Sequence, residues 1–164
     1  MKEKYDVPVA PLSEFVSYMM EQMSHFGLPC TEEQAKDFYL YYVHMIETNK
    51  YLNLTGITDM KEVVVKHMID SLSCYDPEII KSGMSIIDIG TGAGFPGIPL
   101  AIYDRNLKVT LFDSLKKRLT FLESVIDELK LTNCTTLHGR AEDLSHQDYR
   151  ESFDIATSRA VARL

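Results

Sequence analysis

Four glycines stand close together in the segment DIGTGAGFPGIP, residues 88–99. Glycine allows a backbone to turn sharply and to lie close to a ligand, so this density predicts a binding loop. The dinucleotide pattern G-x-G-x-x-G is matched by Gly92, Gly94 and Gly97. The pattern D-x-G-x-G-x-G, found at sites for S-adenosylmethionine (SAM), is matched by Asp88, Gly90, Gly92 and Gly94. The loop by itself leaves both ligands open.

The chain around this loop alternates short apolar runs with helical patterns from residue 84 onward. Buried parallel strands are expected over residues 84–89, 107–112, 134–137 and 153–157. Ser114 is expected to cap a helix after the second strand, and a short helix is expected over residues 141–150. This order predicts an α/β fold with a parallel, doubly wound, Rossmann-like sheet. The glycines then occupy the first strand-to-helix turn.

Three helices are expected before the sheet. Ser13 is a candidate cap for the first, which should end near Gly27, and residues 31–34 form a capping box for the second. Asp59 should open the third. We therefore expect an N-terminal helical segment, residues 1–83, that packs on a cofactor domain formed by residues 84–164.

Two aspartates bear on the choice of ligand. Asp113 follows the second strand, where a carboxylate can accept hydrogen bonds from the ribose of either ligand. Asp88 stands at the end of the first strand, where it would repel a pyrophosphate but attract the ammonium and sulfonium groups of SAM. At ~5 Å and an effective dielectric constant near 20, one such charge pair is worth about 3 kcal/mol. The charge of Asp88 therefore favours SAM.

Three further residues follow the third and fourth strands. A backbone N–H at Ala141 could serve an adenine ring acceptor, and the region of Glu142 could serve its amino group. An acidic first turn favoured by the helix dipole explains Glu142 equally well. Arg159 could bind the carboxylate of the cofactor or an RNA phosphate, or it could form a plain surface ion pair.

Composition limits the class of protein. With 45% hydrophobic and 25% charged residues, the chain of 164 residues is typical of a globular protein. A net charge of −7 argues weakly against a nucleic-acid partner, but residues 84–164 hold 10 basic and 11 acidic side chains and can form a local basic face. Three widely spaced cysteines, no long apolar run and no apolar leader predict a cytoplasmic protein without a membrane segment or signal peptide.

Several longer blocks carry a family resemblance. They are DIGTGAGFPGIPLAI, LFDSLKKRLTFL, GRAEDL and SRAVARL, with NLTGITD and VVVKHMIDSLS upstream. From about residue 10 to its last residue, the chain resembles the glucose-inhibited division protein B family, bacterial class I SAM-dependent methyltransferases that act on guanine N7 of small-subunit (16S) rRNA. By this resemblance, the SAM-contacting positions are Gly90, Phe95, Ala141, Glu142 and Arg159. Asp88, Gly92, Gly94 and Asp113 follow from the general reasoning above.

The resemblance implies SAM as cofactor, and 16S rRNA or the small ribosomal subunit as partner, with no metal and no membrane. Guanine N7 has a free lone pair, so direct in-line methyl transfer needs no enzymatic nucleophile or base, and we expect no catalytic side chain. Family members continue beyond the fourth strand and are expected to be monomers. The present chain should therefore carry most of the cofactor half, and it could self-associate through the exposed fourth strand.

Alternative functions remain open from the sequence. One is an NAD-dependent oxidoreductase, based on the dinucleotide pattern and Asp113. Another is a truncated fold that binds cofactor without activity. His67, Asp70 and Ser71 share one helix face, and together with Asn53 we give them a supporting role near the cleft. A lone histidine is more often structural, and a metal site would need more ligands.

Overall fold

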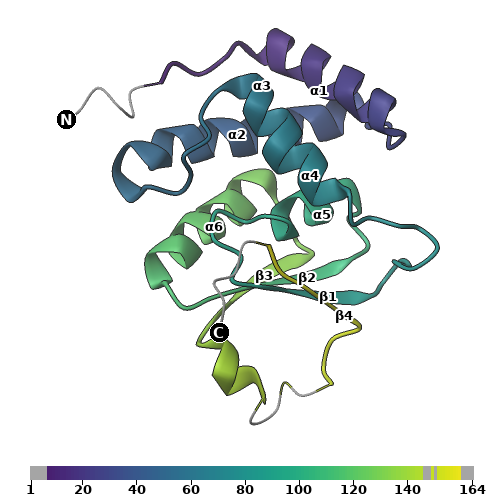
Figure 1. The fold of residues 1–164 in the computed structure, drawn as a ribbon, viewed down its shortest axis with the longest axis vertical. Coiled ribbons are helices and arrows are strands. Elements are labelled where there is room, and N and C mark those ends of the chain that lie inside the picture. The colour runs from purple at the N-terminus through teal and green to yellow at the C-terminus, as the bar shows by residue number, and fades with distance from the viewer. Residues whose placement is uncertain (1–6, 146–148, 150, 160–164) are drawn as a thin grey trace.

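The computed structural model describes residues 7–145, 149 and 151–159. Figure 1 shows N-terminal helices above, a second helical layer in the middle and a sheet beneath. The upper layer contains α1 (Leu12–Phe26), α2 (Glu32–Leu52) and a continuous helix formed by α3 (Met60–Glu62), the π-helical segment η2 (Val63–Ile69) and α4 (Asp70–Leu72). The middle layer contains α5 (Gly97–Tyr103) and α6 (Lys116–Leu129).

The sheet consists of parallel strands in the order β3-β2-β1-β4. Their bounds are β1 (Ser85–Ile89), β2 (Lys108–Asp113), β3 (Cys134–His138) and β4 (Ile155–Thr157). This confirms the α/β class and the parallel sheet that the sequence predicts. β4 pairs with β1 and is an outer strand of the described sheet, with Thr157 opposite Asp88. Self-association through β4 stays a prediction.

The predicted signals at three helix ends are present. Thr31 and Gln34 form the reciprocal capping box of α2, and the Asp59 carboxylate accepts a hydrogen bond from the N–H of Glu62. Gly27 ends α1 with a left-handed backbone (φ 83°), a conformation that glycine adopts without a steric penalty. Local chemistry therefore fixes where these helices begin and end.

Two serines expected to cap helices do not. α1 begins after Pro11, whose φ of −62° suits a helix entrance, and Ser13 makes no capping hydrogen bond. α6 begins after Leu115, one residue later than expected. The carboxylate of Asp113 accepts the hydrogen bond from the N–H of Leu115 at 2.9 Å, so an acidic strand end replaces Ser114 as the local acceptor. The short helix expected after β3 is the 3-10 helix η3 (Ala141–Ser145), and the rest of that expectation falls partly outside the described residues.

A single apolar core connects the helices before the sheet with those that cover it. Phe15 and Met19 of α1, Phe38 of α2, Leu100 of α5 and Leu122 of α6 all belong to this core and are fully buried. Burying each such side chain contributes about 1.5–3 kcal/mol relative to exposure. The domain division at residue 83 stays a prediction, and the segments on either side of it share this core.

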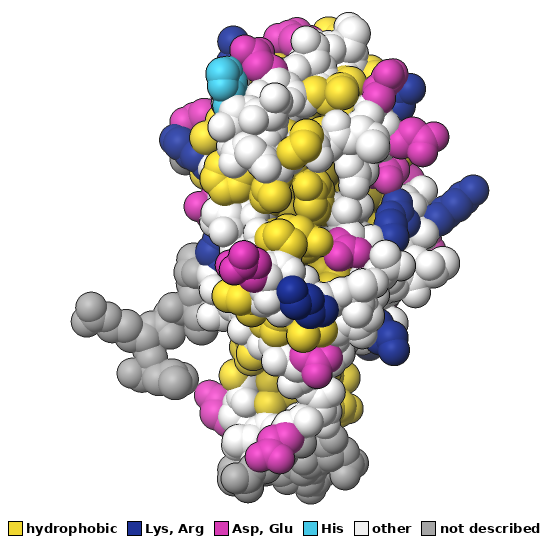
Figure 2. Space-filling view, turned by 90° about the vertical axis from the view of Figure 1, so that its right-hand side faces the viewer, with side chains coloured by type: hydrophobic (Ala, Val, Ile, Leu, Met, Phe, Trp, Pro, Cys, Tyr) yellow, Lys and Arg dark blue, Asp and Glu magenta, His cyan; other side chains and the backbone are white. Residues whose placement is uncertain are grey.

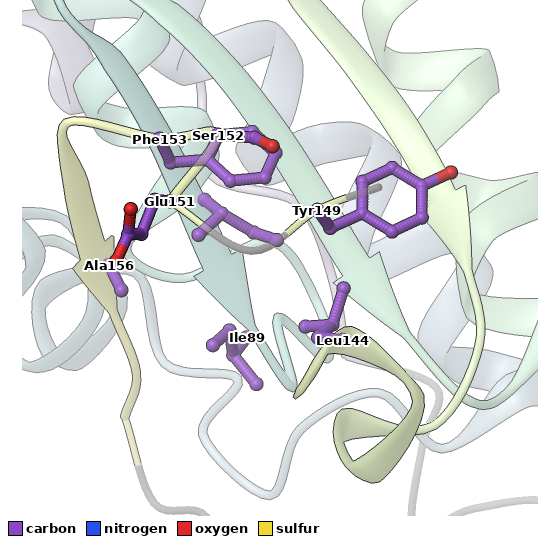
Figure 3. Close-up of a pocket in the computed structure, with 8 residues that line it drawn as sticks. Ile89, Leu144, Tyr149, Glu151, Ser152, Phe153 and Ala156 are labelled. Carbon is purple, nitrogen blue, oxygen red and sulfur yellow. The ribbon is translucent and has the colours of Figure 1, made fainter. Parts of the chain in front are cut away.

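The opposite face of the sheet is covered differently. Figure 1 shows η3 and the segment leading to β4 below the strands. In Figure 3, Ile89 of β1, Leu144 of η3, Phe153 and Ala156 border a hollow, which also includes Ile87 and has a volume of about 190 Å³. Apolar side chains therefore line an open hollow on this face.

The side at the amino ends of the strands lies on the right of Figure 1 and faces the reader in Figure 2. Apolar side chains form a band down its middle, and acidic and basic side chains are mixed around it. None of the helices in the described part of the chain combines the length and apolar character that crossing a membrane requires.

A polar contact between α2 and α6 adds to the shared core. His44 of α2 contacts the Glu128 carboxylate through Nδ1 at 2.5 Å and the Ser124 hydroxyl through Nε2 at 3.0 Å. Its ring also lies edge-on to Phe121, at 5.6 Å between ring centroids. One imidazole thus joins the helical segment to the first helix after β2.

We expect a measurable coupling between His44 and Glu128. In a double-mutant cycle of His44→Ala and Glu128→Ala, followed by urea unfolding, the coupling free energy should be about 0.5–1 kcal/mol, because both side chains are partly exposed. The matched control is the exposed Glu32–Lys36 pair within α2, which should give about 0.3–0.5 kcal/mol. A His44–Glu128 coupling no larger than this control would contradict the interpretation.

Candidate functional site

The glycine loop follows β1 and packs tightly against neighbouring helices. Gly94 has φ 104°, and a Cβ there would lie 2.7 Å from both Ile98 Cγ1 and the Tyr41 hydroxyl oxygen. The Tyr41 hydroxyl donates a short hydrogen bond to the carbonyl of Ala93. A Cβ at Gly97 would lie 2.2 Å from Leu111 Cδ2. Close packing against neighbouring side chains therefore requires glycine at positions 94 and 97.

Asp88 supports this loop from within. Its side chain is fully buried, and Oδ2 accepts hydrogen bonds from the Thr91 hydroxyl at 2.7 Å and the N–H of Gly97 at 2.8 Å. Oδ1 is buried without a hydrogen-bond partner among the described residues. Burial raises the pKa of this carboxyl to about 6. The structure thus places Asp88 in contact with its own loop, and a direct contact with a cofactor stays a prediction.

Asp113 connects the loop to the end of β2. Oδ2 accepts a hydrogen bond from the N–H of Gly92 at 2.9 Å, and Oδ1 accepts the one from Leu115 described above. The Arg118 guanidinium lies 3.6 Å from Oδ2. Each carboxylate oxygen can accept more than one hydrogen bond, so Asp113 retains acceptor capacity toward a ligand.

A cleft of about 210 Å³ opens beside the loop. It collects residues from five parts of the chain, namely Leu54, Thr55, His67, Gly90, Thr91, Gly92, Ala93, Phe95, Arg118 and Arg159. Of the predicted site residues, Gly90, Gly92, Phe95 and Arg159 therefore meet here. Gly94 belongs to the loop but packs against Tyr41 and Ile98 and does not line the cleft. Ala141 and Glu142 are exposed on η3 and do not line this cleft.

Thr91 and Arg118 are cleft residues that the sequence reasoning missed. Both lie within sequence blocks that carry the family resemblance. In the described ranges 7–145, 149 and 151–159, His, Cys, Asp and Glu side chains form no group of three or more able to hold a metal ion.

Arg159 follows β4 and is held by the helical segment. Nη1 donates hydrogen bonds to the Asp70 carboxylate at 3.1 Å and the Lys66 carbonyl at 3.2 Å. Nη2 lies 2.9 Å from His67 Nδ1, and the guanidinium carbon lies 5.0 Å from the centre of the Phe95 ring. A guanidinium has five N–H donors, so two have no partner among the described residues. Arg159 is thus fixed in place while keeping hydrogen-bonding capacity.

The contact with Arg159 determines the tautomer of His67. Because a guanidinium only donates, Nδ1 must accept, and the proton resides on Nε2. Nε2 then donates to the Thr55 hydroxyl at 2.8 Å. The ring also stacks on Phe95, with centroids 4.4 Å apart and planes inclined by 12°. Burial, and then the positive charge of Arg159, lower the pKa of His67 to about 4, so the imidazole is neutral at pH 7.

The loop that carries Thr55 is itself held by α2. Asn49 Oδ1 accepts hydrogen bonds from the N–H groups of Leu54 and Thr55, and Nδ2 donates to the Thr55 carbonyl. Asn53 ends α2 in a left-handed conformation, and the Ser71 hydroxyl donates to the carbonyl of His67. Asn53 and Ser71 thus shape the local backbone. The helical segment therefore orients Arg159 through Thr55, His67 and Asp70.

We expect His67→Ala to lower the free energy of unfolding by about 1–3 kcal/mol, because it leaves one half-buried donor of Arg159 and the Thr55 hydroxyl without their partner. His67→Asn should recover part of this loss, since its Oδ1 can replace Nδ1 as an acceptor. Urea unfolding measures both. His25→Ala, at an exposed position near the end of α1, is the matched control and should change little. Equal losses for the Ala and Asn variants would contradict the role of Nδ1.

A second expectation concerns pH. The folded-state pKa of Asp88 is raised to about 6, whereas an unfolded aspartate titrates near about 4. The folded chain thus retains a proton that the unfolded chain has lost, and the free energy of unfolding falls as pH rises through this window. Asp88→Asn does not titrate. As pH rises from 4 to 7, the free energy of unfolding of the original chain should fall by about 2–3 kcal/mol relative to that of Asp88→Asn. Urea unfolding at several pH values measures this difference. Parallel pH profiles for the two chains would rule it out.

The chain is similar to known proteins over most of its length. The family model for rRNA small subunit methyltransferase G (GidB) matches residues 34–164. A ribosomal RNA small subunit methyltransferase G from Leuconostoc mesenteroides is 48% identical over 147 residues, which cover 88% of this chain and 62% of the relative. One from Lachnoclostridium phytofermentans is 47% identical over 148 residues, covering 90% and 61%.

Among solved structures, a coclaurine N-methyltransferase bound to N-methylheliamine and SAH aligns with a TM-score of 0.50 and 15% identity. The alignment covers 96% of this chain and 52% of that enzyme, and it supports the fold alone. The chain spans less than two thirds of the length of the curated relatives that it matches. On the sequence match and the fold together, the chain belongs to the rRNA small subunit methyltransferase G (GidB) family.

Proposed function

We propose that this chain forms the cofactor-binding part of a SAM-dependent methyltransferase that modifies N7 of a guanine in 16S rRNA. Family membership supports methyl transfer to small-subunit rRNA. One structural observation carries the proposal furthest. The cleft at the carboxyl ends of the strands combines the glycine loop with an oriented arginine, Arg159. Parallel α/β sheets bind ligands at these strand ends.

The described side chains fit the polar groups of SAM. Asp113 keeps acceptor capacity at the end of β2, where it can bind ribose hydroxyls. Arg159 has two N–H donors without a described partner, which suits the carboxylate of the cofactor. Gly90 and Gly92 bring the loop backbone to the cleft, and the Phe95 ring adds an apolar wall. Ala141 and Glu142 follow β3, where we assign them to the adenine.

The reaction requires little acid or base catalysis by the protein. When bound, SAM supplies a methyl group on a positively charged sulfur, and guanine N7 supplies its own lone pair. No proton has to leave N7, so no general base is required. The chain's contribution is to hold the two reactants in line, and such positioning can account for up to ~7–11 kcal/mol of a barrier. We accordingly assign binding and orientation, and no nucleophile, to the residues of the cleft.

The RNA partner would meet a mixed surface with local positive charge. Lys116 and Lys117 are exposed at the start of α6, next to Arg118 of the cleft. Phosphate contacts from such side chains supply much of the affinity for nucleic acid and make it dependent on salt. A cytoplasmic location and a monomeric whole protein complete the proposal.

Calorimetric titration with S-adenosylhomocysteine and, separately, with NAD tests the proposal. We expect binding of S-adenosylhomocysteine, and binding of NAD alone would overturn the assignment. Gly90→Ala should weaken S-adenosylhomocysteine binding at least about tenfold, because φ at Gly90 is 68° and the residue lines the cleft. Gly83→Ala is the matched control, since φ there is 83° but the position lies outside the cleft. Equal affinity in both variants would show that Gly90 does not shape the ligand site.

A further inference from the structure

A second cavity of about 390 Å³ lies next to the cleft. Its walls come from α4, from the turn before α5 and from the end of β4, and they comprise Asp70, Ser71, Ser73, Cys74, Pro96, Ala156, Thr157, Ser158 and Arg159. Arg159 lines both cavities, and Pro96 of this one adjoins Phe95 of the other. A volume above about 300 Å³ is in the range of small-molecule sites. The two cavities are therefore neighbours with a shared arginine.

We propose that this second cavity receives the target guanine and that Asp70 recognises its Watson–Crick edge. The inference rests on the proposed function and adds a site and a specificity-determining residue to it. Asp70 lies on α4 and lines this cavity together with residues from the end of β4.

The hydrogen-bonding capacity of Asp70 matches guanine better than it matches any other standard base. An ionised carboxylate only accepts hydrogen bonds. Guanine presents two adjacent donors, N1–H and the 2-amino group, which a carboxylate can accept side by side. Adenine presents an unprotonated N1 at the matching position, which a carboxylate repels. Enzymes that modify a base commonly read this edge after the base leaves its stack.

The carboxylate is both oriented and available. Asp70 Oδ2 accepts a hydrogen bond from Arg159 Nη1 at 3.1 Å, which fixes the direction of the carboxylate. Oδ1 has no hydrogen-bond partner among the described residues, and the side chain is 56% exposed. The hydroxyls of Ser71 and Ser73 donate to backbone carbonyls of α4 and η2, so Ser158 is the cavity serine that we assign as donor to guanine O6.

Recognition at this edge leaves the reacting atom free. N7 lies on the Hoogsteen side of guanine, away from N1 and the 2-amino group. A base held by Asp70 therefore keeps the N7 lone pair unbonded, as methyl transfer requires. Because Arg159 borders both cavities, the same side chain that we assign to the cofactor also fixes the carboxylate that reads the base.

The test is an NMR titration of the isotopically labelled chain, saturated with S-adenosylhomocysteine, with GMP, IMP and AMP. The three nucleotides share ribose and phosphate, so differences report on the base. GMP should shift the amide signals of residues 70–74 and 157–159 in a saturable way. IMP, which lacks the 2-amino group, should bind about tenfold more weakly, the loss expected for one hydrogen bond to a charged group. AMP should bind more weakly still.

Two variants separate recognition from structure. Asp70→Asn keeps an oxygen that can accept from Arg159 but replaces the second acceptor with a donor, so it should remove the preference for GMP over IMP. Glu78→Gln, an exposed carboxylate outside the cavity, is the matched control and should preserve it. If the role of Asp70 is only structural, Asp70→Asn should weaken the binding of all three nucleotides equally.

The outcomes distinguish the two proposals. If S-adenosylhomocysteine binds but GMP, IMP and AMP shift the same signals with equal affinity, or none binds saturably, the guanine site is wrong and the proposed function stands. A GMP preference that survives in Asp70→Asn also overturns the role of Asp70. If S-adenosylhomocysteine itself does not bind, the failure lies in the proposed function, and the inference that rests on it falls as well.

Discussion

The contact between Arg159 and His67 joins the two parts of the molecule at the cleft. Arg159 comes from the end of β4 and His67 from the helices before the sheet, yet their nitrogen atoms lie 2.9 Å apart. The contact forces one tautomer on the imidazole and lets it bind Thr55 on its other side. Stacking of both groups on Phe95 extends this arrangement to the glycine loop. Three segments distant in sequence thus share one polar cluster.

The two aspartates near the strand ends are both buried, but they have different partners. Asp88 and Asp113 both end neighbouring parallel strands and both accept hydrogen bonds from loop N–H groups. Asp88 is fully enclosed beneath the loop, so its charge is costly and its pKa is raised. Asp113 has Arg118 nearby and lies at the mouth of β2. One carboxylate therefore holds the loop to the start of α5, and the other connects the loop to the end of β2.

Much of the fold could be predicted because it depends on local patterns. Short apolar runs and the glycines between them predict the parallel strands and the first turn, and Thr31 and Gly27 predict helix ends through their own chemistry. Capping by Ser13 and Ser114 was wrong because Pro11 and Asp113 already provide the local geometry there. For these elements, residues close together in the sequence largely determine where each strand, turn or helix end lies.

The site could be predicted only in part. Gly90, Gly92, Phe95 and Arg159 meet in the cleft, and their contact with a cofactor stays a prediction. The tautomer of His67 could not be predicted, since it depends on a residue 92 positions away. Nor could the burial of Asp88, because the atoms that enclose it belong to several elements. Properties of the site that depend on contacts between residues far apart in the sequence therefore could not be predicted from local sequence patterns.

The pairing of β4 with β1 has a consequence for how the molecule is assembled. Asp154, just before β4, accepts a hydrogen bond from the N–H of Ser85 across a separation of 69 residues. Contacts that close such long loops form late, because the chain loses much conformational freedom before it gains them. Arg159 is attached to this strand, whereas the loop and helices that it contacts come earlier in the chain. Both ligand cavities therefore become complete only when β4 has paired with β1, because Arg159 borders each of them.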